Sequence, residues 1–289
     1  MDEPGFTKTK LSDCRVAIWG LGLMGGSLAM ALRGKCARLV AIDRDSATVA
    51  LAKALAVVDE AVTDAREGLA EADLIILATP VRTILAMLEA LPDLMPGKAI
   101  VMDLGSTKAR IIEAMRGLPE RFDPLGAHPM CGKETAGLRS ADGGIYQHAP
   151  FALVALERTS PRARVLAEEL AREARACPLW IDAAEHDRWV AATSHTPFLL
   201  AAALAQATPG AAAPLVGPGF RGAARLAATA PEMMVDILAT NTGSVRAALA
   251  RVREQLSLYD ALLEAGDYET LAEQFRAAAD HLQKLSQTA

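Results

Sequence analysis

The sequence predicts an α/β protein: a Rossmann-like, parallel-sheet dinucleotide-binding domain over residues 1–182, followed by an all-α substrate and dimerisation domain over residues 183–289. Three observations support this fold class. Short apolar runs alternate with helical stretches in the first part of the chain, a glycine-rich turn joins the first run to the first helical stretch, and strand-like runs stop after Asp182. Alternating strands and helices of this length build a parallel sheet through right-handed crossovers.

The first domain begins with Arg15 to Trp19, a short apolar run that ends at Gly20 and is typical of a buried parallel strand. The residues after it keep the alternation. The sequence predicts further strands over 39–42, 73–78 and 98–102, helices over 24–32, 47–55, 81–91 and 107–115, and two late strands over 151–156 and 179–181 around a helix over 162–174. One more strand is expected directly before Gly126.

The second domain is predicted to be helical throughout. Asp182, with Glu185 in the following turn, resembles a capping box that opens the first helix. Residues 201–204 and 235–238 belong to stretches that are apolar on several sides. Such helices pack against a second copy of the chain as well as against each other, so we expect a homodimer.

Composition limits the classes of function. Of the 289 residues, 52% are hydrophobic and 22% are charged, and the formal net charge is −5. These values fit a globular protein with sizeable cores and argue against a nucleic-acid partner, which needs a basic face. The apolar run over 198–205 is too short to cross a bilayer, so we expect no membrane partner. Four widely spaced cysteines without a CxxC pair, after an acidic N-terminus unlike a signal peptide, indicate a cytoplasmic protein without a metal site.

The glycine-rich turn reads Gly20-Leu21-Gly22-Leu23-Met24-Gly25 and opens the first helix. The first glycine permits a tight turn, the second lets the backbone approach a pyrophosphate, and the third lets helix and strand pack closely. The phosphates then lie at the helix N-terminus, where free N–H groups and the helix dipole favour negative charge. A turn of this kind occurs in many α/β proteins, but here strand, turn, helix and second strand follow in order, which predicts a dinucleotide site.

The second strand ends at Asp43, where a ribose-binding acid is expected. A carboxylate at this place accepts hydrogen bonds from ribose hydroxyls and repels a 2′-phosphate, so we expect NAD as the cofactor. Arg44 leaves NADP open, because a neighbouring arginine can hold that phosphate. The predicted cofactor-binding residues are Gly20, Gly22, Leu23, Met24, Gly25, Asp43, Arg44 and Thr79.

Two polar motifs follow strands at the predicted ligand edge of the sheet. Ser106 lies in the segment 103–108 (DLGSTK), and His128 lies in the segment 126–130 (GAHPM). A histidine with its ordinary pKa of about 6.5 can accept the proton of a substrate hydroxyl as a hydride leaves. Ser106 could instead only cap its helix, and His128 could be only a hydrogen-bonded loop histidine. Their positions beside the nicotinamide site favour catalytic roles.

With these motifs the chain resembles the prephenate dehydrogenase family, which includes the arogenate and cyclohexadienyl dehydrogenases. The resemblance also rests on later segments in family order: 132–137 (GKETAG), 194–197 (SHTP), 217–225 (GPGFRGAAR) and 231–237 (PEMMVDI). It departs from the family pattern at Met234, where tryptophan is frequent, and at Pro218, where glycine is frequent. Both departures leave the choice between prephenate and arogenate open.

The resemblance implies an NAD-dependent oxidative decarboxylation of prephenate, arogenate or both, in tyrosine biosynthesis. Hydride leaves the hydroxyl-bearing ring carbon, carbon dioxide leaves the opposite carbon, and the ring becomes aromatic. His128 matches the family histidine that polarises or deprotonates the hydroxyl, and Ser106 matches the serine that orients it. The implied substrate-binding residues are His195, Arg225, Glu134 and Gly219; Arg225 would hold a carboxylate with a bidentate guanidinium.

Two alternative functions fit parts of the pattern. A 3-hydroxyacid dehydrogenase of the β-hydroxyisobutyrate type shares the glycine-rich start and a helical second domain, but it relies on a lysine in that domain. Here the only lysine after Asp182 is Lys284, in the last helix. A dinucleotide-binding module without catalysis is the other alternative, against which Ser106 and His128 speak.

Several polar residues are given no site role. His148, His186 and His281 have no partner pattern and are interpreted as surface or structural histidines. Asp182, Glu185, His186 and Asp187 are close in sequence, but adjacent helix positions do not converge on one metal ion, so helix capping explains them better. Lys108 is expected either to raise the local potential or to be solvated, and Cys131 to be a small buried side chain.

Overall fold

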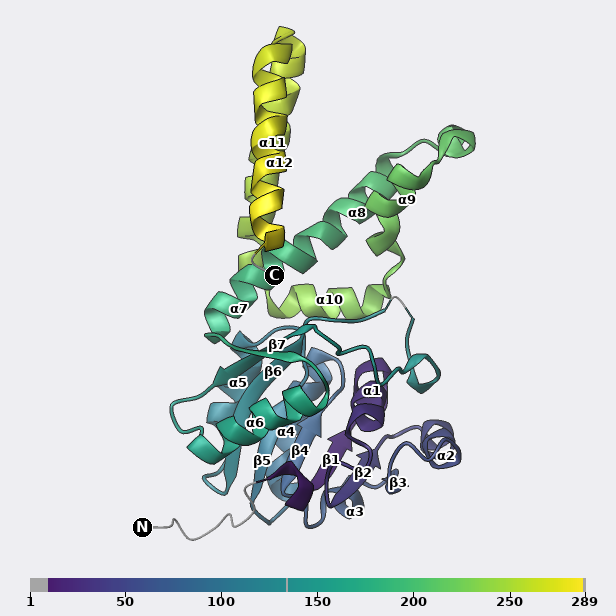
Figure 1. Ribbon diagram of the computed structural model, residues 1–289, viewed down its shortest axis with the longest axis vertical. Helices are drawn as coiled ribbons and strands as arrows, with labels where there is room; N and C mark the ends of the chain where they lie inside the picture. Colours follow the sequence, from purple (N-terminus) through teal and green to yellow (C-terminus); the bar gives the residue numbers. More distant parts are fainter. Residues whose placement is uncertain (1–9, 134, 288–289) are drawn as a thin grey trace.

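The computed structural model describes residues 10–133 and 135–287, and within them the first domain is built on an eight-stranded sheet. The order of its strands is β3-β2-β1-β4-β5-β6-β7-β8 (Figure 1). The strands are β1 Arg15–Trp19, β2 Arg38–Ile42, β3 Glu60–Val62, β4 Leu74–Leu77, β5 Ala99–Asp103, β6 Phe122–Pro129, β7 Pro150–Ala155 and β8 Cys177–Trp180.

The sheet is parallel from β3 to β6 and again between β7 and β8, but β7 runs antiparallel to β6. The predicted α/β fold with a parallel sheet is therefore confirmed except at this one junction. A parallel neighbour needs a crossover, usually a helix, whereas an antiparallel neighbour needs only a return of the chain. Between β6 and β7 the described residues form only the short 3₁₀ helix η2, Leu138–Ser140.

Helices cover both faces of the sheet. They are α1 Leu23–Leu32, α2 Ser46–Ala54, α3 Ala65–Leu69, α4 Val81–Leu94, α5 Ala109–Arg116 and α6 Pro161–Glu173. Because side chains alternate along a strand, Val16 and Ile18 of β1 enter the core beneath α1, α2 and α6, while Ala17 enters the core beneath α3, α4 and α5. Both faces are thus buried, which leaves the edge formed by the carboxyl ends of the parallel strands for a ligand.

The second domain contains only helices among its described residues. They are α7 Ala183–Val190, the π-helical η3 Ala191–His195, α8 Thr196–Ala207, η4 Gly210–Leu215, α9 Pro218–Ala224, η5 Arg225–Ala228, α10 Pro231–Thr240, α11 Thr242–Ala265 and α12 Tyr268–Gln287. Asp182 caps α7 as predicted, since its carboxylate accepts the backbone N–H groups of Ala184 and Glu185 at 2.8 and 3.2 Å. In the described part of the chain, no helix is long and apolar enough to cross a membrane.

The two domains meet above the carboxyl edge of the sheet. Helix α10 lies across this edge, while α11 and α12 form a hairpin that extends away from it (Figure 1). Asp236 of α10 accepts the backbone N–H of Arg82, at the start of α4, at 2.9 Å and also pairs with the guanidinium of that residue. Asp187 of α7 binds the start of α5. These contacts fix helices of the second domain over the predicted site.

Candidate active site

A cavity of about 370 Å³ lies between the carboxyl edge of the sheet and the second domain. From the first domain it is lined by the glycine-rich turn, the ends of β4 and β5, and the segment that follows β6; from the second domain it is lined by residues before and within α10. The predicted site residues on its wall are Gly22, Leu23, Met24, Thr79, Ser106 and His128, and the second domain contributes Thr229, Ala230, Met233, Asp236 and Ile237.

The glycine-rich turn has the geometry that a pyrophosphate requires. Gly20 has a φ of 109°, which only glycine adopts readily, and a Cβ on Gly25 would lie 1.9 Å from the carbonyl oxygen of Gly20. A Cβ on Gly22 would meet nothing within 4 Å, because this residue faces the cavity at the start of α1. The turn therefore leaves open space at a helix N-terminus whose own sequence provides no side-chain cap, as a bound phosphate needs.

Asp43 directly follows β2 and lies beside this turn. Its carboxylate accepts the backbone N–H of Leu21 at 2.8 Å and that of Asp45 at 3.0 Å, which fixes its position. A carboxylate has about four lone-pair sites, so these two bonds leave capacity for ribose hydroxyls. Arg44 is exposed next to it. The arrangement fits a dinucleotide with free ribose hydroxyls.

A buried ion pair shapes the loop that carries Ser106. Lys108 and Asp103 are both fully buried and bonded to each other, and the Lys108 ammonium also donates to the carbonyl of Ala127 at 2.6 Å. Asp103 in turn accepts the backbone N–H groups of Gly105 at 2.7 Å and Ala127 at 3.1 Å. Burial lowers the pKa of Lys108 and raises that of Asp103. The ion pair between the two residues opposes both shifts without reversing them. The expectation of a solvated Lys108 is therefore wrong: this side chain ties β5 to β6.

Ser106 does not cap the helix that follows it. Helix α5 begins after Lys108, and its first free N–H groups, those of Lys108 and Ala109, are bound by the carboxylate of Asp187 at 2.7 and 2.9 Å. Because the second domain provides this cap, the Ser106 hydroxyl is left for the cavity that its residue lines.

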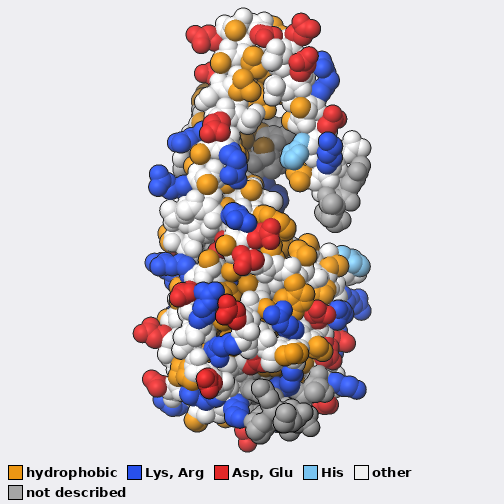
Figure 2. All heavy atoms as spheres, turned by 90° about the vertical axis from the view of Figure 1, so that its left-hand side faces the viewer, with side chains coloured by type: hydrophobic (Ala, Val, Ile, Leu, Met, Phe, Trp, Pro, Cys, Tyr) orange, Lys and Arg blue, Asp and Glu red, His pale blue; other side chains and the backbone are white. Residues whose placement is uncertain are grey.

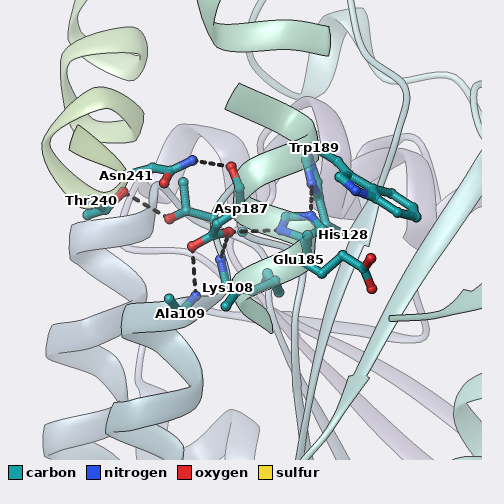
Figure 3. Close-up of polar contacts among 12 residues, drawn as sticks. Lys108, Ala109, His128, Glu185, Asp187, Trp189, Thr240 and Asn241 are labelled. Carbon is teal, nitrogen blue, oxygen red and sulfur yellow. Dashed lines mark hydrogen bonds and ion pairs between the residues drawn. The ribbon is translucent and has the colours of Figure 1, made fainter. Parts of the chain in front are cut away.

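His128 is the last residue but one of β6 and is hydrogen bonded to a second histidine (Figure 3). Its Nδ1 lies 2.9 Å from Nε2 of His186, and Nδ1 of His186 lies 2.8 Å from a carboxylate oxygen of Asp187. Burial, followed by the nearby His186, Lys108 and His195, holds the pKa of His128 well below its ordinary value, so its imidazole is neutral at pH 7. A neutral imidazole is the form that can accept a proton.

The contacts of His186 and Asp187 correct two interpretations of the sequence. Their side chains are only 2% and 4% exposed, so of the two interpretations of His186, a surface or a structural histidine, the surface one is wrong. Asp187 caps α5 of the other domain rather than its own helix. Sequence reasoning missed this pair because His128 and His186 are 58 residues apart and meet only through the docking of two domains. The single available signal was a histidine next to an aspartate in the first turns of a predicted helix.

Three of the four predicted substrate residues are described by the structure, and none of the three lines the cavity wall. His195 is 1% exposed and has its Nδ1 3.4 Å from Nδ2 of Asn241. Arg225 in η5 and Gly219 in α9 are exposed, and neither lines the cavity within one chain. Glu134 lies outside the described residues. Met234, the departure from the family pattern, is buried, and its neighbour Met233 lines the cavity instead.

Comparison with known proteins identifies similar proteins along most of the chain. The family model "Prephenate dehydrogenase, nucleotide-binding domain" matches residues 28–177, and the model "Prephenate dehydrogenase, dimerization domain" matches residues 182–277. A prephenate dehydrogenase of Bacillus subtilis (strain 168) is 31% identical over 281 residues, which cover 92% of this chain and 74% of that protein.

Two crystal structures extend the similarity to the fold. Synechocystis arogenate dehydrogenase is 29% identical, has a TM-score of 0.81, and the match covers 93% of this chain and 99% of the other. Prephenate dehydrogenase from A. aeolicus, in complex with hydroxyphenyl propionate and NAD+, is 25% identical with a TM-score of 0.87, and the match covers 95% of this chain and 99% of the other.

Proposed function

This chain belongs to the prephenate dehydrogenase family, and on that premise we propose that it catalyses the NAD-dependent oxidative decarboxylation of prephenate, arogenate or both in tyrosine biosynthesis. Prephenate would give 4-hydroxyphenylpyruvate, and arogenate would give tyrosine. The observation that carries the proposal is that His128 and Ser106 line the same cavity as the phosphate-binding turn around Gly22.

The residues of the cavity provide the proton chemistry of this reaction. NAD, when bound along Gly22 and Asp43, supplies the acceptor for the hydride. Neutral His128 accepts the proton of the ring hydroxyl as the hydride leaves its carbon, and Ser106 orients that hydroxyl toward the imidazole. The loss of carbon dioxide from the opposite carbon turns the resulting ketone into a phenol, and His128 returns the proton to its oxygen.

The substrate carboxylates need cations in a protein of net negative charge. We assign Arg225 to one of them because its segment matches the family motif and because a guanidinium binds a carboxylate with two hydrogen bonds. Arg225 lies outside the cavity of one chain, so its contribution requires the pairing of two chains. His195, Glu134 and Gly219 are kept as proposed substrate residues on the same motif evidence.

The protein is proposed to be a cytoplasmic homodimer with its domain boundary between residues 182 and 183. The family model for the second domain is a dimerization domain, which supports the dimer. Figure 2 shows apolar side chains on the upper part of the molecule, where the α11–α12 hairpin lies. All four cysteines belong to the described residues and are free thiols, as in a reducing compartment. For the boundary, Asp182 is the residue that caps α7.

The 3-hydroxyacid dehydrogenase alternative is not favoured. Lys284, the one lysine of the second domain, belongs to the helical hairpin that extends away from the sheet (Figure 1), and it does not line the cavity. The residues that do line it include no lysine from the second domain.

Replacing His128 by asparagine tests the proposed function. Asparagine keeps a donor near the position of Nδ1 but has no base at the position of Nε2. Because general-base catalysis contributes about 10²–10⁴-fold, we expect kcat with NAD to fall by that factor while the affinity for NAD stays unchanged. The measurement is NADH formation with prephenate and with arogenate, beside a fluorescence titration with NAD. A variant with undiminished turnover, or a wild type inactive on both substrates, contradicts the proposal.

A further inference from the structure

We infer that His186 and Asp187 are positioning residues that fix the tautomer of His128, so that its Nε2 atom is the base that faces the cavity. The inference rests on the proposed function for its kinetic consequences. Neither residue lines the cavity, so neither can touch a substrate, and both must act through His128. The three side chains form one continuous chain of hydrogen bonds across the interface between the domains (Figure 3).

The direction of these hydrogen bonds follows from the ionisation of Asp187. Burial raises the pKa of this carboxyl, but hydrogen bonds from His186 and from the backbone of Ala109 and Lys108 outweigh that effect and hold it below its ordinary value. An ionised carboxylate only accepts hydrogen bonds, so Nδ1 of His186 must carry the proton in the 2.8 Å contact.

The tautomer of His128 follows in turn. An imidazole that carries a single proton, on Nδ1, has a lone pair on Nε2. In His186 this Nε2 atom lies 2.9 Å from Nδ1 of His128. Nδ1 of His128 therefore donates, which leaves its Nε2 without a proton and ready to accept one. The opposite tautomer would place a lone pair against a lone pair at Nδ1 and would put a hydrogen where the base is needed.

Asp187 is fixed by hydrogen bonds to its side-chain carboxylate and to its backbone carbonyl. Its carboxylate receives the backbone N–H groups of Lys108 and Ala109, and its carbonyl oxygen accepts Nδ2 of Asn241 at 2.7 Å. Lys108 and Ala109 lie two and three residues after Ser106. One carboxylate therefore fixes both the segment that carries Ser106 and, through His186, the orientation of His128.

Three variants separate positioning from mere packing. His186→Leu removes the acceptor, His186→Gln keeps an amide oxygen that can accept from His128, and Asp187→Asn removes the charge that fixes the proton on His186. His281→Gln, at an exposed histidine of α12, is the matched control for the glutamine exchange. In enzymes where an aspartate orients a catalytic histidine, exchange of that aspartate for asparagine lowers kcat by about 10⁴-fold.

We expect kcat to fall by about 10²–10⁴-fold in His186→Leu and Asp187→Asn, and by no more than about tenfold in His186→Gln, with NAD affinity and KM little changed. His281→Gln should match the wild type. If His186 only supported packing, its replacement would lower the stability of the protein and raise KM, and glutamine would not restore kcat. His186→Leu with wild-type kcat, or His186→Gln as inactive as His186→Leu, overturns the inference.

A spectroscopic measurement decides the tautomer without any turnover. The ¹⁵N resonances of the His128 ring, assigned by their loss in His128→Asn, should show a protonated Nδ1 and an unprotonated Nε2 in the wild type. In Asp187→Asn the proton should redistribute toward Nε2. A wild-type His128 protonated on Nε2 refutes the inference even if the enzyme is active. Conversely, an enzyme inactive on both substrates refutes the proposed function while these resonances still decide the tautomer.

Discussion

Buried histidines link the stability of this protein to pH. His195 is almost fully buried, and desolvation, opposed by Asp187 and reinforced by His186, lowers its pKa from 6.5 to about 4. Between these two values the unfolded chain binds a proton that the folded chain does not bind. Stability therefore rises with pH through this window: it is complete above pH 6.5 and is lost as the pH falls toward 4.

Replacing His195 by glutamine should remove part of this acid sensitivity. From the shift to about 4, the contribution of His195 between pH 7 and pH 4.5 is about 2–3 kcal/mol, which the variant should no longer lose. Urea unfolding at the two pH values measures the difference, with His281→Gln as the exposed control. Part of the loss should persist in His195→Gln because His128 is shifted in the same direction. Equal losses in the wild type and His195→Gln would show that His195 is not the group responsible.

Single residues differ in how far the sequence reveals their roles. The places of Ser106 and His128 on the cavity wall could be predicted, because each lies at the carboxyl end of a strand within a recognisable motif. His186 could not be assigned, since its partner comes from another domain, and Lys108 could not, since its burial depends on a neighbouring strand. A local pattern indicates which side chains lie at a sheet edge, but not which side chains the second domain brings onto them.

The first turn of α1 is the element on which the proposed cofactor binding depends. Gly25 has no room for a side chain, because an added Cβ would lie 1.9 Å from the carbonyl oxygen of Gly20 and 2.9 Å from Cβ of Ala78. Gly22, in the same turn, has open space on the cavity side. The two glycines therefore offer a matched pair: Gly25 is required by packing, and we expect Gly22 to be required by the ligand.

Gly25→Ala and Gly22→Ala should fail in different ways. We expect Gly25→Ala to lower the free energy of unfolding by about 1–3 kcal/mol or more, since the helix must move away from the sheet. Gly22→Ala should keep its stability but lose at least about tenfold in NAD affinity, or ~1.4 kcal/mol, because the methyl group occupies the place of the pyrophosphate. Urea unfolding and a fluorescence titration with NAD distinguish the two. Undiminished NAD binding by Gly22→Ala would contradict the phosphate site at this turn.

The elements were predictable where their pattern is long or their flanking residues are distinctive. Strands β1, β2, β4 and β5 follow from apolar runs, and α4 and α6 follow from helical periodicity, with ends displaced by a few residues. The short elements β3 and α3 have too few residues to show a period, so they were missed. The antiparallel pairing of β7 was missed because strand direction depends on the connection, and the sequence before β7 shows only the absence of a long helix.

The helical domain has a small apolar core of its own and leaves large apolar side chains exposed in a single chain. Among the described residues, its own buried apolar cluster consists of Ala191, Val245 and Ala248, with Leu199 and Leu238 packed against it. Meanwhile Leu263 and Phe275 are each 54% exposed and Leu282 is 65% exposed, all on α11 and α12. Helices of this length with apolar faces in water need a partner, and we propose that a second copy of the hairpin provides one.

The variant Leu282→Glu tests this pairing. Its control is Gln283→Glu, which adds the same charge at the next residue of α12. If Leu282 is buried between two chains, its charged variant must desolvate a carboxylate or dissociate, and dissociation to a monomer costs less. Light scattering coupled to size exclusion should therefore show a dimer for the wild type and for Gln283→Glu, and a monomer for Leu282→Glu. A wild type that is monomeric at micromolar concentration contradicts the dimer, and a dimeric Leu282→Glu places its interface elsewhere.

The same variant connects assembly with the substrate site. The cofactor turn and the His128–His186–Asp187 chain lie within one chain, so a monomeric Leu282→Glu should bind NAD with unchanged affinity. Arg225 is outside the cavity of that chain, so the monomer should lose the proposed carboxylate anchor. We therefore expect its KM to rise by about 10–100-fold, because a hydrogen bond to a charged group contributes ~1.5–3 kcal/mol. Steady-state kinetics on the isolated monomer measure this. An unchanged KM would mean that the substrate carboxylate is bound entirely within one chain, and Arg225 would then have no part in it.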